Sequence, residues 1–150
     1  MKRIYLDVCC LNRPFDNQSI DRIHLESEAI MLILKRFEAV EWTWISSAVI
    51  DYEVDQTPDF ERKRRVNTLL SSAHQVVLLT EEIIRRGDQI KQLGFGSYDA
   101  LHIASAEAGE ADVVLTTDDK LIRLAMRHLR EIRVLVSNPL QWFQEEMHHG

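Results

Sequence analysis

The sequence predicts an α/β fold, a three-layer α/β/α sandwich with a mostly parallel central sheet. Two observations carry this prediction. First, short apolar runs of strand type alternate with longer segments in which apolar residues recur every three or four positions. Second, no repeat, low-complexity stretch or linker interrupts the alternation. Strands separated by helices form parallel sheets that helices cover on both faces. We therefore expect residues 1–150 to form a single domain.

Composition limits what this domain can do. Its hydrophobic content of 45% suffices for one core, and no apolar run is long enough to span a membrane. The net charge of −6 argues against a general binder of phosphate backbones, although a protein that holds divalent cations can be acidic and still bind a polyanion. Cys9 and Cys10 are adjacent, so a disulfide between them would be strained. Because the N-terminus also lacks a secretion signal, we expect a reduced, cytoplasmic protein.

The first part of the chain is expected to contain a strand, a loop and a long helix. Residues 3–7 form a short apolar run that ends in an acid, which is typical of a strand, and residues 12–17 are rich in turn-forming types. Apolar residues at helical spacing then predict an amphipathic helix over about residues 21–40. The apolar face of this helix contains Leu25, Ala29, Leu32, Ile33, Phe37 and Val40.

Further strands are expected wherever a short apolar run is bounded by polar or turn-forming residues. They cover residues 41–45, 75–79, 112–116 and 132–136. The helices between them begin at residues that suit a helix N-terminus or its first turn. These starts are Ser46–Ser47, Thr57–Pro58, Thr80, Ser97, a position after Asp118–Asp119, and Asn138–Pro139. The terminal His148–Gly150 is too short to indicate a tag or a metal site.

The helix expected to begin near Ser97 carries a face of small residues. Ala100, Ala104 and Ala108 recur every four positions, which allows the helix to lie close against a sheet. Asp99 lies in the first turn of this helix, where the positive end of the helix dipole favours an ionised carboxylate. A carboxylate is therefore expected at the helix end that approaches the sheet.

Four acids occupy comparable places near the carboxyl ends of the expected strands. Asp7 ends the first strand, Glu53 lies within two helical turns of the second, and Asp118 follows the fourth. Together with Asp99 they are expected to converge, because ligands bind at this edge of an open parallel sheet. Ionised carboxylates that share a pocket require cations, and hard oxygen ligands favour Mg²⁺ or Mn²⁺. One or two such ions would suit phosphodiester chemistry.

The chain also resembles the PIN-domain nucleases, including toxins of the VapC type. Four segments carry the resemblance, and their order along most of the chain is more specific than any one of them. They are Tyr5-Leu6-Asp7, Ser47–Glu53, Tyr98–Ala104 and Val113–Lys120. The sequence departs from the family pattern after Asp7, where Val8, Cys9 and Cys10 stand in place of a small hydroxylated residue and an asparagine.

The resemblance implies a PIN-like fold and a metal-dependent endoribonuclease. Asp7, Glu53, Asp99 and Asp118 would hold Mg²⁺ or Mn²⁺, and a metal-activated water would hydrolyse RNA phosphodiester bonds. The implied partners are an RNA substrate, an antitoxin protein if the chain is the toxin of such a pair, and a second copy in a homodimer. Three further residues are candidates for substrate binding: Asn12, the nearest amide after Asp7; Arg13, as a phosphate clamp; and Thr116, which would orient a carboxylate or a water.

Several alternatives stay open at this point. Asp118 is preferred to Asp119 as the fourth acid because its spacing from Thr116 fits better. His102 shares a helix face with Asp99, and a packed or hydrogen-bonded role is favoured over that of a general base. A non-catalytic PIN-like module that binds RNA or protein is the main alternative function. A phosphatase with Asp7 as nucleophile is disfavoured, because Cys9 stands where a second acid is expected.

Overall fold

The computed structural model describes residues 1–149 and contains one five-stranded sheet; Gly150, the last residue of the expected domain, lies outside the described residues. The strands are β1 (Arg3–Leu6), β2 (Thr43–Ser47), β3 (Gln75–Val77), β4 (Val113–Leu115) and β5 (Leu135–Ser137). They are ordered β3-β2-β1-β4-β5, and each neighbouring pair is parallel. The predicted α/β fold with a parallel central sheet is confirmed.

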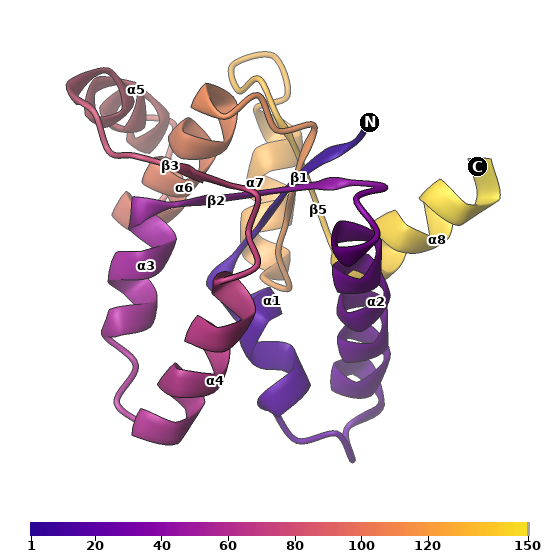
Figure 1. Ribbon diagram of the computed structural model, residues 1–150. Helices are drawn as coiled ribbons and strands as arrows, with labels where there is room; N and C mark the ends of the chain where they lie inside the picture. Colours follow the sequence, from indigo (N-terminus) through magenta and orange to yellow (C-terminus); the bar gives the residue numbers. More distant parts are fainter. Residues whose placement is uncertain (150) are drawn as a thin grey trace.

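Helices pack on both faces of this sheet. They are α1 (Val8–Asn12), the 3₁₀ helix η1 (Arg13–Phe15), α2 (Asp21–Glu38), α3 (Ala48–Asp55), α4 (Phe60–Leu70), α5 (Glu81–Lys91), α6 (Ser97–Ala108), α7 (Asp119–Arg127) and α8 (Pro139–His149). The strand order reverses direction after β3, so right-handed crossovers place α5, α6 and α7 on the face opposite to α2 and α4. Figure 1 shows α2 and α4 on one side of the sheet, with α5 and α6 on the other.

Capping side chains explain where most helices begin. Ser47 and Thr80 accept hydrogen bonds from backbone amides three residues later, as the sequence predicts. The start predicted at Thr57–Pro58 is wrong, because Asp59 caps α4 instead and accepts from the amides of Glu61 and Arg62. The loop predicted over residues 12–17 is also wrong in part, since α1 and η1 extend to Phe15.

The buried face of α2 differs from the predicted one. Leu25, Leu32 and Val40 were expected inside but are 47%, 40% and 61% exposed. Glu26 is instead buried, because three side chains bond its carboxylate. The donors are Arg13 Nε at 2.8 Å, Arg22 Nε at 3.2 Å and Asn138 Nδ2 at 2.6 Å. A paired carboxylate can thus be buried in the helix face where periodicity alone predicts leucine.

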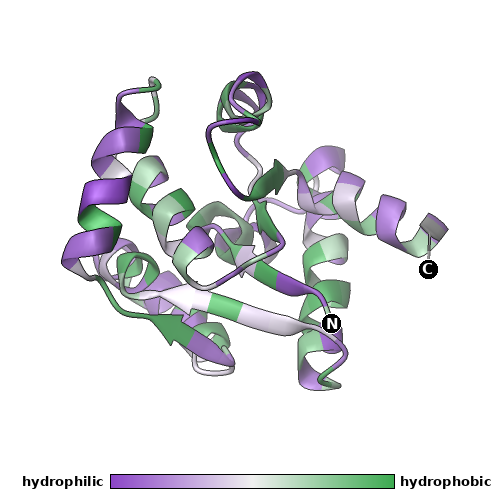
Figure 2. Ribbon diagram, turned by 90° about the horizontal axis from the view of Figure 1, so that it is seen from above, coloured by the Kyte–Doolittle hydropathy of each residue, from purple (hydrophilic) through white to green (hydrophobic). Residues whose placement is uncertain are grey.

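The core lies between the sheet and its helices. In Figure 2 hydrophilic and hydrophobic residues alternate along the helices, as expected for elements with one buried face. Phe37 of α2 stacks on Trp44 of β2 with ring centroids 5.3 Å apart. Trp142 packs against Trp42 at 5.1 Å and so holds α8 on the domain. Within residues 1–149, none of the helices combines the length and the apolar character that crossing a membrane requires.

Helix α6 approaches the sheet closely through small residues. Ala100 and Ala104 are buried as the alanine spacing predicts, whereas Ala108 is exposed. The closest approach is at Gly109, just after the helix. A Cβ atom there would lie 2.8 Å from Ile45 Cγ2 and 2.9 Å from Val77 Cγ2. The absence of a side chain at Gly109 therefore sets the distance between α6 and two neighbouring strands.

Replacing Gly109 with alanine should destabilise the fold. We expect Gly109→Ala to lower the free energy of unfolding by about 1–3 kcal/mol, because the new methyl group overpacks against the branched side chains of Ile45 on β2 and Val77 on β3. Gly87→Ala is the matched control: its Cβ would have a single contact below 3.0 Å, with the end of the Leu101 side chain at 2.9 Å. A gain of up to about 1 kcal/mol in helix propensity should offset that contact. Urea denaturation of both variants measures the difference in unfolding free energy. Equal losses in the two variants would contradict the role of Gly109 in setting the distance between α6 and the strands.

Candidate active site

The acids predicted to converge lie around the carboxyl ends of three neighbouring strands. β2, β1 and β4 are adjacent in the sheet, and their ends at Ser47, Leu6 and Leu115 form one edge. Asp7 follows β1 directly and Asp118 lies three residues after β4. Glu53 is on α3, which begins where β2 ends, and Asp99 lies in the first turn of α6. Parallel topology therefore brings segments up to 111 residues apart in the chain to one edge.

Asp7 is the most firmly held of these acids. Its side chain is nearly buried, and both of its oxygens accept hydrogen bonds. Oδ1 accepts from the Val8 amide at 2.8 Å, and Oδ2 accepts from the Thr116 hydroxyl at 2.8 Å. The Thr116 oxygen in turn accepts from the amide of Asp118 at 3.2 Å. Thr116 thus fixes the Asp7 carboxylate and ties it to the segment that carries Asp118.

Cys9 occupies the space beside Asp7. Its sulfur lies 3.4 Å from Oδ2 of Asp7 and 3.3 Å from Oγ1 of Thr116, and it accepts from the amide of Thr117 at 3.3 Å. Cys9 and the buried Cys10 are both free thiols. Val8, Cys9 and Cys10 thus form the start of α1, and Cys9, like Thr116, contacts Oδ2 of Asp7.

Glu53 is held by a buried chain of hydrogen bonds that the sequence does not indicate. Nε2 of His102 lies 2.8 Å from Oε1 of Glu53, and Nδ1 of His102 lies 2.7 Å from the Tyr5 hydroxyl. The Tyr5 hydroxyl also lies 2.7 Å from Oγ of Ser47, the residue that caps α3. Tyr5, His102 and Ser47 are buried, so this chain links the core of the sheet to an acid at its edge. The preferred interpretation of His102 as a hydrogen-bonded residue agrees with these contacts.

The charges around His102 favour its protonation. Burial lowers the pKa of the imidazole, but the hydrogen bond to Glu53 and the charges of Asp7, Glu53 and Asp99 outweigh it, and the pKa is raised above its usual value. Burial keeps the Tyr5 hydroxyl protonated by raising its pKa well above the ordinary range. A protonated His102 would therefore neutralise part of the charge between Glu53 and Asp7, whose Oδ1 lies 3.9 Å from Nε2.

The pKa of Asp99 is shifted by burial and by the charges of the other acids. Burial, followed by the charge of Asp7, raises the pKa of its carboxyl group to about 6. His102 opposes this shift, whereas Asp118 and Glu53 add to it. Asp99 is thus within electrostatic range of every other acid of the predicted set. Burial and the nearby negative charges thus act together on this carboxyl group.

Asp118 and its neighbour Asp119 have different surroundings. Oδ1 of Asp118 caps α7 by accepting from the amides of Lys120 and Leu121. Both oxygens of Asp119 are bonded by the guanidinium group of Arg22, at 2.8 and 2.9 Å, and this cation lowers the pKa of Asp119. Asp119 is therefore already paired with a cation, which leaves Asp118 as the acid better suited to an added one.

Asn12 and Arg13 are not brought to the acids. The amide of Asn12 donates to the carbonyl oxygen of Val8 at 3.1 Å, and its oxygen accepts from Arg62 at 3.3 Å. Arg13 bonds Glu26 at 2.8 Å and Asp16 at 3.3 Å. Arg13 therefore ties η1 to α2, Asn12 joins α1 to Arg62 of α4, and neither side chain touches one of the four acids.

Three side chains come close enough to share an ion. One potential ligand atom from each of Asp7, Glu53 and His102 lies within 4.8 Å of the others. Asp99 and Asp118 lie outside this distance but contribute charge to the same edge. Each carboxylate oxygen has two lone pairs, so the existing hydrogen bonds leave acceptor capacity on Asp7 and Glu53. Because Nε2 of His102 is engaged by Glu53, the donors open to a divalent cation such as Mg²⁺ or Mn²⁺ are the hard carboxylate oxygens of this edge.

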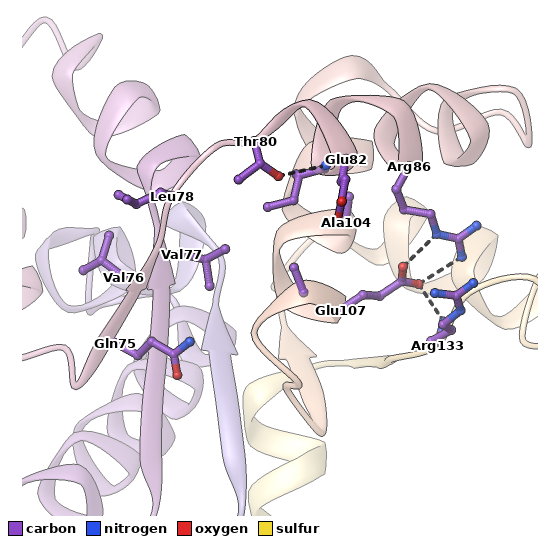
Figure 3. A pocket seen from close by; sticks show the side chains of 12 residues that line it. Gln75, Val76, Val77, Leu78, Thr80, Glu82, Arg86, Ala104, Glu107 and Arg133 are labelled. Carbon is purple, nitrogen blue, oxygen red and sulfur yellow. Dashed lines mark hydrogen bonds and ion pairs between the residues drawn. The ribbon is translucent and has the colours of Figure 1, made fainter.

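A separate groove of about 600 Å³ lies between β3, α5 and α6. Figure 3 shows its lining, where Arg86 bonds Glu107 and the backbone amide of Arg133 donates to the same carboxylate. None of the four predicted acids lines it. The groove therefore belongs to a different part of the surface from the acidic edge.

Known structures share this fold. One is that of VapBC2 from Rickettsia felis bound to a promoter DNA fragment, with 17% identity and a TM-score of 0.56. Another is that of VapBC-1 from nontypeable Haemophilus influenzae, with 15% identity and the same TM-score. In each case the match covers 91% of this chain and 98% of the other. At these identities the similarity establishes the fold alone.

Sequence comparison identifies the family. No curated protein sequence matches the chain significantly. The family model of the PIN domain, however, matches residues 4–126, which include most of β1, all of β4 and all four of the predicted acids. This chain therefore belongs to the PIN domain family.

Proposed function

We propose that this PIN-domain protein is a metal-dependent endoribonuclease that hydrolyses RNA phosphodiester bonds. The observation that carries the proposal is that ligand atoms of Asp7 and Glu53 lie within 4.8 Å of each other and of His102, next to Asp99, whose pKa burial and the charge of Asp7 raise to about 6. Uncompensated negative charge on a polar surface costs free energy unless a cation relieves it. Divalent cations bound by carboxylates are the usual means of phosphodiester hydrolysis.

Asp7, Glu53, Asp99 and Asp118 are the residues that would hold the ion, Mg²⁺ or Mn²⁺. When bound, such an ion supplies a water of lowered pKa and positive charge for the phosphate oxygens. The side chains around the acids orient them. Thr116 fixes Asp7 through its hydroxyl, and His102 fixes Glu53 through Nε2. No protein nucleophile is required in this scheme.

We also propose protein partners for the chain. The two similar structures are those of VapBC proteins, and one of them is bound to promoter DNA. By analogy, the chain is the toxin of a toxin–antitoxin pair, with an antitoxin as its partner and a homodimer as its assembly. This analogy rests on the fold and is independent of the acids, so loss of catalysis would not contradict it.

Cleavage of RNA tests the catalytic proposal. We expect the protein to cut single-stranded RNA with Mn²⁺ or Mg²⁺ and to be inactive in EDTA. Asp7→Asn should reduce cleavage at least 100-fold, because the charge that holds the ion is lost while the hydrogen bond to Thr116 can persist. Asp88→Asn, on the exposed face of α5, is the matched control and should retain full activity. Full activity of Asp7→Asn with an unchanged circular dichroism spectrum would reject the assignment.

A titration with Mn²⁺ by calorimetry tests the metal site without any substrate. We expect the parent and Asp88→Asn to bind Mn²⁺, and Asp99→Asn to bind it at least 10-fold more weakly. Failure of the parent to bind would instead favour the alternative, a non-catalytic PIN-like module that binds RNA or protein.

The raised pKa of Asp99 predicts a pH-dependent stability. The folded state favours the neutral carboxyl more than the unfolded state does, so ionised Asp99 destabilises the fold above about pH 6 and ceases to do so below 3.8. In EDTA, Asp99→Asn should therefore be more stable than the parent by about 1–2 kcal/mol at pH 7.5 and nearly equal at pH 4. Urea denaturation at the two pH values measures this. If Asp99→Asn is less stable than the parent at pH 7.5, ionised Asp99 does not destabilise the fold.

A further inference from the structure

Two tyrosines stand exposed beside the acidic edge. Tyr52 precedes Glu53 on α3, and Tyr98 precedes Asp99 on α6. Their side chains are 58% and 43% exposed, although large aromatic side chains are usually mostly buried. The two rings lie against each other, with centroids 6.1 Å apart and planes 31° apart. They form an aromatic surface made by two helices that are distant in sequence.

This aromatic surface is continuous with the acids. Each tyrosine is the immediate neighbour of a proposed metal ligand, and α3 and α6 are joined by the hydrogen bond between Glu53 and His102. A nucleotide whose phosphate lies at the acids would therefore have a neighbouring base within reach of the two rings.

The geometry of the rings restricts how a base would bind. A base held between two rings requires about 7 Å, twice the rise of about 3.4 Å between stacked bases. The separation of 6.1 Å is too small, so a base would stack on the outer face of the pair. Stacking on aromatic side chains is tolerant of base identity, and it requires a base that is not already stacked within a duplex.

We propose that Tyr52 and Tyr98 form a stacking platform for an unpaired nucleobase next to the scissile phosphate of RNA bound at the acidic site. The inference rests on the proposed nuclease function and adds to it two residues that bind the substrate. A protein partner seated on the same rings is the competing occupant, and the experiment below separates the two.

Kinetics of cleavage test the platform. With single-stranded RNA and Mn²⁺, we expect Tyr52→Ala and Tyr98→Ala each to raise KM about 10-fold while kcat changes less than 3-fold, because a stack is lost but the acids remain. Tyr98→Phe retains the ring and should keep KM within 2-fold. Phe60→Ala, at a ring that is 77% exposed at the start of α4, is the matched control and should leave KM unchanged. An unchanged KM in the double variant Tyr52→Ala/Tyr98→Ala would overturn the proposal.

A binding measurement separates failure of the platform from failure of the nuclease proposal. A single-stranded oligonucleotide containing 2-aminopurine loses fluorescence when that base stacks. We expect quenching by the parent and by Tyr98→Phe, and at least 10-fold weaker binding by the double alanine variant. Such a result supports the platform even if no RNA is cut, which would reject only the nuclease. Equal quenching by the parent and the double variant rejects the platform, as does loss of Mn²⁺ binding in the double variant, which would indicate a structural role.

Discussion

Repulsion between carboxylates is the constraint on which this edge of the molecule depends. Asp7, Glu53 and Asp99 are brought to one edge by strands and helices whose positions the core fixes. The chain reduces the repulsion in several ways. Backbone and hydroxyl donors bond Asp7, and an imidazole with a raised pKa bonds Glu53. Asp99 has no comparable donor among the described contacts. Its pKa is raised by burial and by the charge of Asp7.

A second network next to the site explains why no arginine relieves that repulsion. The buried Glu26 takes hydrogen bonds from Arg13 and Arg22, and Arg22 also binds Asp119 and the carbonyl oxygen of Thr117. These contacts tie α2 to the segment that leads into α7. Because burial of Glu26 requires cationic partners, the nearby guanidinium groups are used in fixing the scaffold. The negative field at the sheet edge is left for a mobile cation to neutralise.

Much of the fold could be predicted because its signals are local. Alternation of apolar runs predicts the five strands, and residues such as Ser47 and Thr80 mark helix starts by their own chemistry. The parallel topology that follows from the alternation also predicts that Asp7 and Glu53 approach each other. Helix α1 escaped prediction because five residues are too few for periodicity to appear. The burial of Glu26 could not be predicted, because it depends on a hydrogen bond from Asn138, which is 112 residues away.

The chain of hydrogen bonds from Glu53 to Ser47 shows the same limit for the site. In the sequence, Tyr5 resembles any large residue of a buried strand. The role of its hydroxyl depends on a hydrogen bond with His102, which is 97 residues away. A sequence can indicate which carboxylates share an edge, since the topology decides that. It cannot indicate which buried hydroxyl will hold them, because that choice depends on side-chain packing between elements distant in sequence.

The position of the tryptophans has a spectroscopic consequence. The chain contains three, Trp42, Trp44 and Trp142, and all are buried around the amino end of β2 and the helices α2 and α8. The acids lie at the opposite, carboxyl end of the strands, where the aromatic residues are tyrosines. Indole emission therefore reports the packing of α2 and α8, whereas events at the acids are visible through tyrosine. The two ends of one sheet thus carry separate intrinsic optical probes.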